Sequence, residues 1–115
     1  MAKHLLLFRG GDDKMKDMSP DEMDRHMARW SEWVESMREK AIYQGGAPLK
    51  DVGVVVNPDQ TISDGPFVET KEIIGGYIAV DVESLDVALA VAKECPILGI
   101  GGAVEVRPIA ETCGS

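Results

Sequence analysis

The sequence predicts an α+β fold, in which a ferredoxin-like antiparallel sheet carries two helices on one face. Apolar runs of strand length alternate with two helical stretches, and the resulting order is β-α-β-β-α-β. The chain has 115 residues, of which 44% are hydrophobic, and this is enough to bury the core of one domain. We therefore expect a single domain over residues 1–115.

The first predicted strand covers residues 4–9, and residues 10–14 are expected to form a loop. A clear helix start follows. Ser19 is the expected N-cap, Pro20 suits the first helical position, and Glu22 completes a capping box. These residues predict the first helix on local grounds alone.

The first helix is expected to run to about Tyr43 and to end at Gly45 and Gly46. Its apolar residues recur at steps of three and four, which indicates one buried stripe. The stripe is predicted to consist of Met23, Met27, Trp30, Val34, Met37 and Ala41.

The second half of the chain supplies the remaining elements. Ser84 is expected to cap the second helix and Pro96 to stop it. The inner face of that helix is predicted to be Leu85, Ala88, Leu89 and Ala92. The predicted strands are residues 52–56, a short return strand at 61–62 that extends the central hairpin, residues 73–80, and residues 104–109.

Several predicted strands are apolar on both faces, which indicates a partner. A strand with one solvent-exposed face should alternate between apolar and polar side chains. This alternation is missing from residues 5–8, 54–56 and 73–80. Two helices can cover only one face of the sheet. The other face is therefore expected to be buried against a second copy, in a homodimer.

The charge of the chain excludes some partners. The net charge is −8, from 20 acidic and 12 basic residues, and this sign repels nucleic-acid phosphates and anionic membrane surfaces. No apolar run reaches the length of a membrane span, and the first residues lack the layout of a signal peptide. We expect a cytoplasmic protein with no direct nucleic-acid partner and no membrane partner.

No cofactor is expected. The sequence has no glycine-rich nucleotide loop of the Walker or Rossmann type. Its two histidines and two cysteines do not have zinc-ligand spacing. Cys95, beside Pro96, is expected to be a buried small apolar residue.

The most distinctive stretch is a predicted rigid turn from Asp64 to Phe67. Gly65 tolerates positive φ and Pro66 fixes its own φ, so the turn holds the Asp64 carboxylate beside the Phe67 ring. An apolar strand follows, and polar groups on rigid turns at strand edges commonly build binding pockets. Asp64 and Phe67 are therefore candidate site residues.

This turn is also the centre of a family resemblance. Together with Glu69, Lys71-Glu72 and Gly75-Gly76, it resembles the DGPF-domain proteins, a branch of the YCII-related family. Further agreement lies in residues 5–8, 19–23, 45–49 and 101–108. The resemblance covers nearly the whole chain, and it implies a dimeric α/β barrel.

The resemblance also implies a catalytic pair. YCII-related proteins pair a histidine on the first helix with an aspartate as a dyad, and His26 occupies the matching helix. The family's aspartate precedes a proline after the second helix, where this chain has Cys95, so Asp64 is the substitute we propose. An imidazole paired with a carboxylate suits general base catalysis. The alternatives are a boundary histidine bonded to a backbone carbonyl or water, and an aspartate that caps its own turn.

Tyr77 and Arg107 are the remaining candidate binding residues. Glu105 and Arg107 lie two apart on one strand and share a face, from which Arg107 could grip a carboxylate or phenolate ligand. A salt-bridged pair at the dimer interface is the alternative. Tyr77 could donate a hydrogen bond to a ligand, or fill a half-buried strand position.

Two functions follow from these residues. The first is cofactor-independent elimination or isomerisation of a small molecule, and the resemblance supports it because the family includes dehydrochlorinase-like enzymes. His26 would be the general base, Asp64 its orienter or an acid, and Tyr77 and Arg107 the anchors of the substrate. The alternative is a non-catalytic ligand-binding or protein-binding module. DGPF-domain proteins often occur with alternative sigma factors, which implies a regulatory protein partner in transcription.

Overall fold

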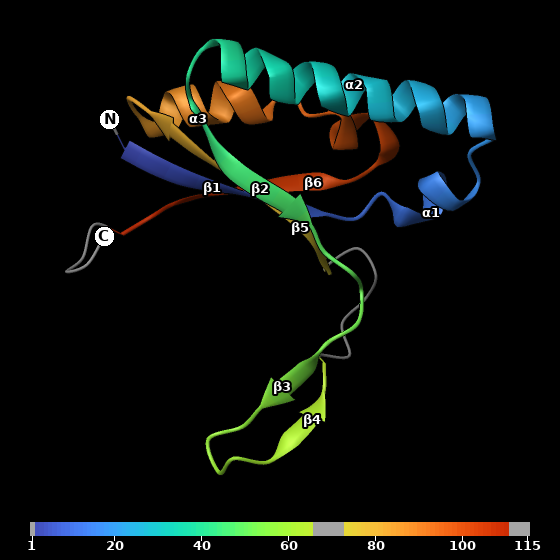
Figure 1. Ribbon diagram of the computed structural model, residues 1–115, viewed down its shortest axis with the longest axis vertical. Coiled ribbons are helices and arrows are strands. Elements are labelled where there is room, and N and C mark those ends of the chain that lie inside the picture. The colour runs from blue at the N-terminus through green and yellow to red at the C-terminus, as the bar shows by residue number, and fades with distance from the viewer. Residues whose placement is uncertain (1, 66–72, 111–115) are drawn as a thin grey trace.

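The computed structural model describes residues 2–65 and 73–110, which form a layered body and a projecting hairpin (Figure 1). The strands are β1 (Ala2–Arg9), β2 (Tyr43–Pro48), β3 (Val54–Val56), β4 (Ile62–Asp64), β5 (Ile74–Val82) and β6 (Ala103–Pro108). The helices are α1 (Asp12–Lys16), α2 (Pro20–Glu39), α3 (Leu85–Ala92) and the 3₁₀ helix η2 (Pro96–Ile100).

The body is a four-stranded antiparallel sheet in the order β2-β5-β1-β6, and the helices lie on one of its faces (Figure 1). The two central strands, β1 and β5, pair along their full lengths from Ala2↔Val82 to Arg9↔Ile74, with one irregularity after Phe8. This arrangement confirms the predicted α+β class and agrees with a ferredoxin-like sheet. The dimeric barrel remains a prediction.

The capped start of α2 is as predicted. The Glu22 backbone amide donates to Ser19 Oγ at 3.1 Å, and the Glu22 carboxylate accepts from the Ser19 amide at 3.5 Å. The helix ends at Glu39 instead of near Tyr43, and Ala41 then adopts a left-handed φ of 58°. The predicted end at the two glycines was wrong.

The identity of the second sheet strand corrects the sequence analysis. It is β2, at residues 43–48, whereas the predicted second strand belongs to the β3–β4 hairpin, a separate two-stranded sheet. The Gly45-Gly46 pair was predicted to end the helix. Gly46 instead lies in β2, where the absence of a side chain allows the backbone of β5 to approach closely. A Cβ at Gly46 would lie 2.3 Å from the Tyr77 carbonyl oxygen.

Smaller differences concern the other element ends. Residues 10–14 were predicted as a loop, yet α1 begins at Asp12, directly after Gly11 with its φ of 85°. The return strand is Ile62–Asp64 and not 61–62, so Asp64 lies in a strand. Ser84 caps α3 as predicted, with its side chain accepting from the Val87 amide, but α3 ends at Ala92 and Pro96 starts η2.

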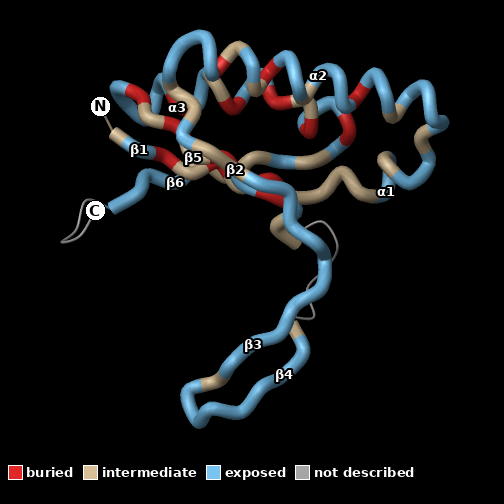
Figure 2. The backbone as a smooth tube through the Cα atoms, in the orientation of Figure 1, coloured by how far each residue is buried: buried red, intermediate tan, exposed pale blue. Residues whose placement is uncertain are grey.

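The core lies between the sheet and the helices (Figure 2). Alternate residues of the central strands point into it and are buried, whereas their neighbours on the other face are partly exposed. The core side chains of the strands are Leu6, Phe8, Ile78, Val80 and Val82, and those of the helices include Trp33, Met37, Ala88 and Ala92. As expected, one face of the sheet carries no helix; we call it the open face.

The buried side of α2 differs from the predicted stripe. Its fully buried residues are His26, Trp33 and Met37, whereas Met27 is 50% exposed. In α3, Ala88 and Ala92 face inward as predicted, but Leu85 and Leu89 are exposed at 44% and 37%. Among the described residues, no helix combines the length and apolarity needed to cross a bilayer.

Candidate functional site

His26 lies in the centre of the buried side of α2. Its residue is only 1% exposed, and its Nε2 accepts a hydrogen bond from Trp30 Nε1 at 2.9 Å. Its Nδ1 is also buried and has no hydrogen-bond partner among the described residues. The expectation that His26 lies beside the apolar stripe, at a helix edge, was wrong.

The surroundings of His26 favour a neutral imidazole. Burial, and secondarily the positive charge of Arg29, lower the pKa of His26 below its ordinary value of 6.5. Because Nε2 accepts the indole hydrogen, the ring proton of the neutral form lies on Nδ1. The Nε2 lone pair, which a general base would use, is therefore already bonded to Trp30.

An aromatic cluster surrounds this contact. The ring centroids of Phe8 and Trp30 are 5.1 Å apart, and those of Trp30 and Trp33 are 5.6 Å apart, all in edge-to-face geometry. Trp33 Nε1 donates to the Val91 carbonyl at 3.1 Å, which ties α2 to α3. The cluster gives both tryptophans a structural role.

Asp64 lies far from this centre. It is the last residue of β4, is exposed, and pairs with Val54 in the hairpin. The hairpin extends from the side of the sheet opposite the helices (Figure 1), so one chain does not bring Asp64 to His26. Phe67, the other predicted residue of the turn, lies outside the described residues.

Tyr77 and Arg107, by contrast, share the open face. Leu7 of β1 pairs with Tyr77 on one side and with Glu105 on the other, and Leu5 pairs with Arg107. Because neighbouring strands are about 4.8 Å apart, the Tyr77 and Glu105 backbones are separated by roughly 10 Å. An arginine side chain can cover most of that distance.

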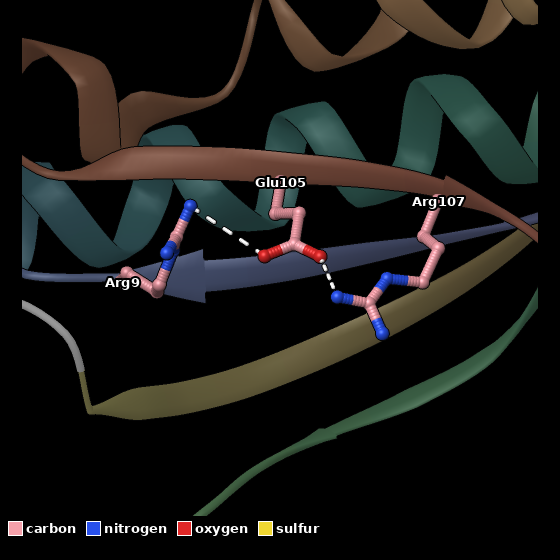
Figure 3. Close-up of polar contacts among 3 residues, drawn as sticks. All are labelled: Arg9, Glu105 and Arg107. Carbon is pink, nitrogen blue, oxygen red and sulfur yellow. Dashed lines mark hydrogen bonds and ion pairs between the residues drawn. The ribbon is translucent and has the colours of Figure 1, made fainter.

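Charged groups on the open face form a cluster of Arg9, Glu105 and Arg107 (Figure 3). Arg107 Nη2 donates to Glu105 Oε2, and Arg9 Nη2 lies 3.5 Å from Glu105 Oε1. Two guanidinium groups thus share one carboxylate, so the cluster has a formal charge of +1. The Arg107 side chain is 68% exposed and is accessible to an anion.

Arg9 is the residue that the sequence analysis missed. The signal was present, because Leu5, Leu7 and Arg9 alternate with the buried residues of β1 and so share the open face. The predicted Glu105–Arg107 ion pair is confirmed as a contact within one chain. Its position at a dimer interface remains a prediction.

Two cavities of the described structure lie elsewhere. One of about 130 Å³ lies between the start of α1 and the end of η2, and a groove of about 300 Å³ follows the outer side of α2 near Trp30 and Arg38. Neither is lined by His26, Asp64, Tyr77 or Arg107. Neither of these two cavities therefore forms a pocket around the predicted site residues.

Cys95 does not replace the missing aspartate. It is 3% exposed, as expected, and burial raises the pKa of its thiol to about 12. A thiol of that pKa is protonated at neutral pH and is a poor nucleophile. In the part of the chain that is described, no three His, Cys, Asp or Glu side chains are grouped to hold a metal ion.

The buried imidazole predicts a pH dependence of stability. The folded-state pKa of His26 is lowered, so the unfolded chain binds its proton more readily, and stability falls as the pH drops below about 6.5. We expect acidification from pH 7.5 to 5.5 to reduce the urea midpoint more in the wild type than in His26→Gln. Equal slopes in the two proteins would show that His26 protonation is not coupled to folding.

Comparison with known proteins identifies the family of this chain. The model of the YCII-related domain matches residues 3–112. The chain belongs to the YCII-related domain family. An uncharacterized protein of Rhizobium meliloti (strain 1021) is 44% identical over 50 residues, and this match spans 43% of the chain and 40% of that protein. The match thus covers less than half the length of this curated relative.

One protein of similar structure is an enzyme. It is the 5-chloro-2-hydroxyhydroquinone dehydrochlorinase TftG from Burkholderia phenoliruptrix AC1100, in complex with 2,5-dihydroxybenzoquinone. The TM-score is 0.53 at 19% identity, and the match covers 96% of this chain and 95% of TftG. At this identity the likeness shows that the YCII-related chain has the same fold.

Proposed function

We propose that this YCII-related protein is a homodimer that binds a small hydroxylated ring compound on the open face of its sheet and catalyses its elimination or isomerisation. The observation that carries the proposal is the position of Tyr77 and Arg107, two predicted binding residues, on one face. That face supplies apolar side chains, a phenol and exposed positive charge within a few strand spacings.

The ligand class follows from these groups. Leu5, Leu7 and Ala79 on the open face are partly exposed, and they offer flat apolar contacts to a ring. The cluster has a formal charge of +1, so it favours a ligand that carries a phenolate or enolate oxygen. The fold likeness to a dehydrochlorinase that binds 2,5-dihydroxybenzoquinone supports the same class.

A homodimer would turn this surface into a chamber. Apolar side chains that remain partly exposed over a whole sheet face commonly mark an interface. A second copy that covers the open face about a two-fold axis would exclude water from the ring and strengthen its contacts with Arg107. This supports the dimer that the residue pattern predicts.

Elimination or isomerisation also requires a group that moves a proton. His26 and Asp64 are the predicted pair, and Asp64 has the better support. Its carboxylate is on an exposed residue, whereas the Nε2 lone pair of His26 is bonded to Trp30. The assignment of Asp64 as the acid or base therefore does not depend on a contact with His26.

Calorimetric titration with 2,5-dihydroxybenzoquinone tests the site. We expect the wild type to bind this probe and Arg107→Gln to bind it roughly 10-fold more weakly or worse, because a charge-assisted hydrogen bond is lost. Tyr77→Phe removes a neutral hydrogen bond, so a reduction of about 3-fold is expected. The affinity for this probe reports the binding of a hydroxylated ring and not turnover.

Arg38→Gln is the matched control. Arg38 is 58% exposed, lies 3.8 Å from the Glu35 carboxylate, and belongs to α2 on the helix side of the sheet. Its removal lowers the net charge by the same amount and should leave probe binding unchanged. An equal loss in Arg38→Gln and Arg107→Gln, or no binding by the wild type, would contradict the site.

The buried His26 favours one alternative. If its imidazole serves only the core, the chain is a non-catalytic ligand-binding or protein-binding module, and the sigma-factor association implied by the family resemblance would name a regulatory partner. Such a module would bind the probe or a basic protein without altering a substrate. Product analysis by mass spectrometry after incubation with hydroxylated ring compounds distinguishes the two functions.

A further inference from the structure

The β3–β4 hairpin and its flanking residues form an arm, residues 49–65, that leaves the body of the protein. The chain departs after Pro48 of β2, and Figure 1 shows the arm extending away from the sheet on the side without helices. Figure 2 shows nearly all of its described residues as exposed. An isolated two-stranded hairpin is at best marginally stable in water, so the arm requires support from another surface.

One face of the arm is apolar. The register pairs Val54 with Asp64 and Val56 with Ile62, so these four side chains share a face, and Val55 and Ser63 share the other. Val54, Val56 and Ile62 are exposed at 68%, 64% and 68%. Three large apolar side chains on one strand pair form a contact surface that nothing in the described chain covers.

The accessible surface of the chain is larger than that of a compact monomer of the same mass. Its accessible surface is 7971 Å², whereas a compact monomer of 12.5 kDa exposes roughly 6200 Å². The radius of gyration is 15.8 Å, against roughly 13 Å for a compact chain of this length. The excess of about 1800 Å² exceeds the roughly 800 Å² that each partner of a standard interface buries.

A second copy of the chain offers a fitting surface. Its open face carries Leu5, Leu7 and Ala79, which are only partly buried, and the arm extends on this same side of the sheet (Figure 1). The arm of one chain points away from its own sheet and cannot cover it. In a two-fold dimer each copy supplies one arm and one open face, so both are covered and the assembly closes.

Charge complementarity favours the same occupant. Asp64 lies on the apolar face of the arm, and the open face of a second copy carries the cluster of Arg9, Glu105 and Arg107, with its formal charge of +1. The chain as a whole has a net charge of −8, so two copies repel each other except where opposite charges meet. This pairing is local and specific.

We propose that two copies exchange their arms. The Val54, Val56 and Ile62 side chains of one copy pack on the open face of the other, and Asp64 lies beside the arginine cluster there. The proposal rests on the dimer of the proposed function and deepens it, since Asp64 of one chain would then stand next to the ligand-binding residues Tyr77 and Arg107 of the other.

Photo-crosslinking tests the contact directly. Val56 is replaced by p-benzoyl-phenylalanine, and equal amounts of ¹⁵N-labelled and unlabelled protein are mixed, irradiated and analysed by mass spectrometry. We expect crosslinks between differently labelled chains, from the arm to peptides of β1, β5 or β6. Crosslinks only within one chain, crosslinks to the helices of another copy, or no crosslink at all would overturn the exchange.

Sedimentation analysis tests the same contact with natural side chains. Val54→Lys with Val56→Lys should weaken dimerisation at least 10-fold, because two charges enter an apolar contact. The control is Ser63→Lys, which adds a charge to the other face of the arm and should weaken it far less. If the wild type and the double variant dimerise equally, the arm exchange is wrong while the dimer stands; if the wild type is a monomer, both fail. Binding of 2,5-dihydroxybenzoquinone is measured separately in each case.

Discussion

Leu6→Ala is expected to lower the free energy of unfolding by about 2–5 kcal/mol. Leu6 is fully buried in the central strand β1; of the residues paired with it, Ile78 of β5 belongs to the same core and Val106 of β6 packs against that core. Removal of its side chain leaves a cavity that the paired strands cannot close, because their hydrogen bonds hold them in place. Urea unfolding monitored by tryptophan fluorescence measures the loss.

Leu98→Ala is the control for this prediction. Leu98 belongs to η2 and is 44% exposed, so its truncation removes contacts without opening a cavity in the core. A loss below about 1 kcal/mol is expected. Equal losses in the two variants would mean that the space between sheet and helices is not the main core.

Gly46→Ala is the second substitution with a large expected effect. The new Cβ would lie 2.3 Å from the Tyr77 carbonyl oxygen and 2.9 Å from the Ile78 Cα. Both atoms belong to the backbone of β5, so no side-chain rotation relieves the clash and β2 must shift. A loss of about 1–3 kcal/mol in the free energy of unfolding is expected.

Gly53→Ala separates this clash from the general effect of replacing a glycine. A Cβ at Gly53 meets no atom within 4 Å, and Gly53 lies in the arm, outside the four-stranded sheet. Its stability should match that of the wild type to within about 0.5 kcal/mol. If Gly46→Ala also behaves as the wild type, the close pairing of β2 with β5 is not required.

The sequence predicted the binding residues on the open face better than it predicted the position of His26. Tyr77 and Arg107 were predicted as binding residues, and alternation along β5 and β6 was enough to place each on a face. That both lie on the same face as Arg9 depended on the order of the strands, which pairs β1 with β5 on one side and β6 on the other. Spacing along the chain carries no information about that order.

The position of His26, in contrast, was predicted incorrectly. The helical repeat predicted a stripe that included Met27 and left His26 beside it, yet Met27 is exposed and His26 is buried. Adjacent residues of a helix point in directions about 100° apart, so an error of one residue places the buried side of α2 on the wrong face. Hydrophobicity alone does not determine which face of the helix is buried, because the His26 ring can accept a hydrogen bond from Trp30 one turn away. The Trp30–His26 hydrogen bond makes a polar ring acceptable in the core.

Local interactions explain what the sequence by itself determined: the capped starts of α2 and α3, the apolar strands β1, β5 and β6, and the α+β class with one face free of helices. Each depends on residues a few positions apart. Only the tertiary structure decided that residues 43–48 form the second sheet strand, that the β3–β4 hairpin projects as an arm, and that Asp64 and His26 lie apart within one chain. These features depend on which strands meet in space. From the sequence alone Gly46 indicates a helix end, whereas the structure places it against the backbone of β5.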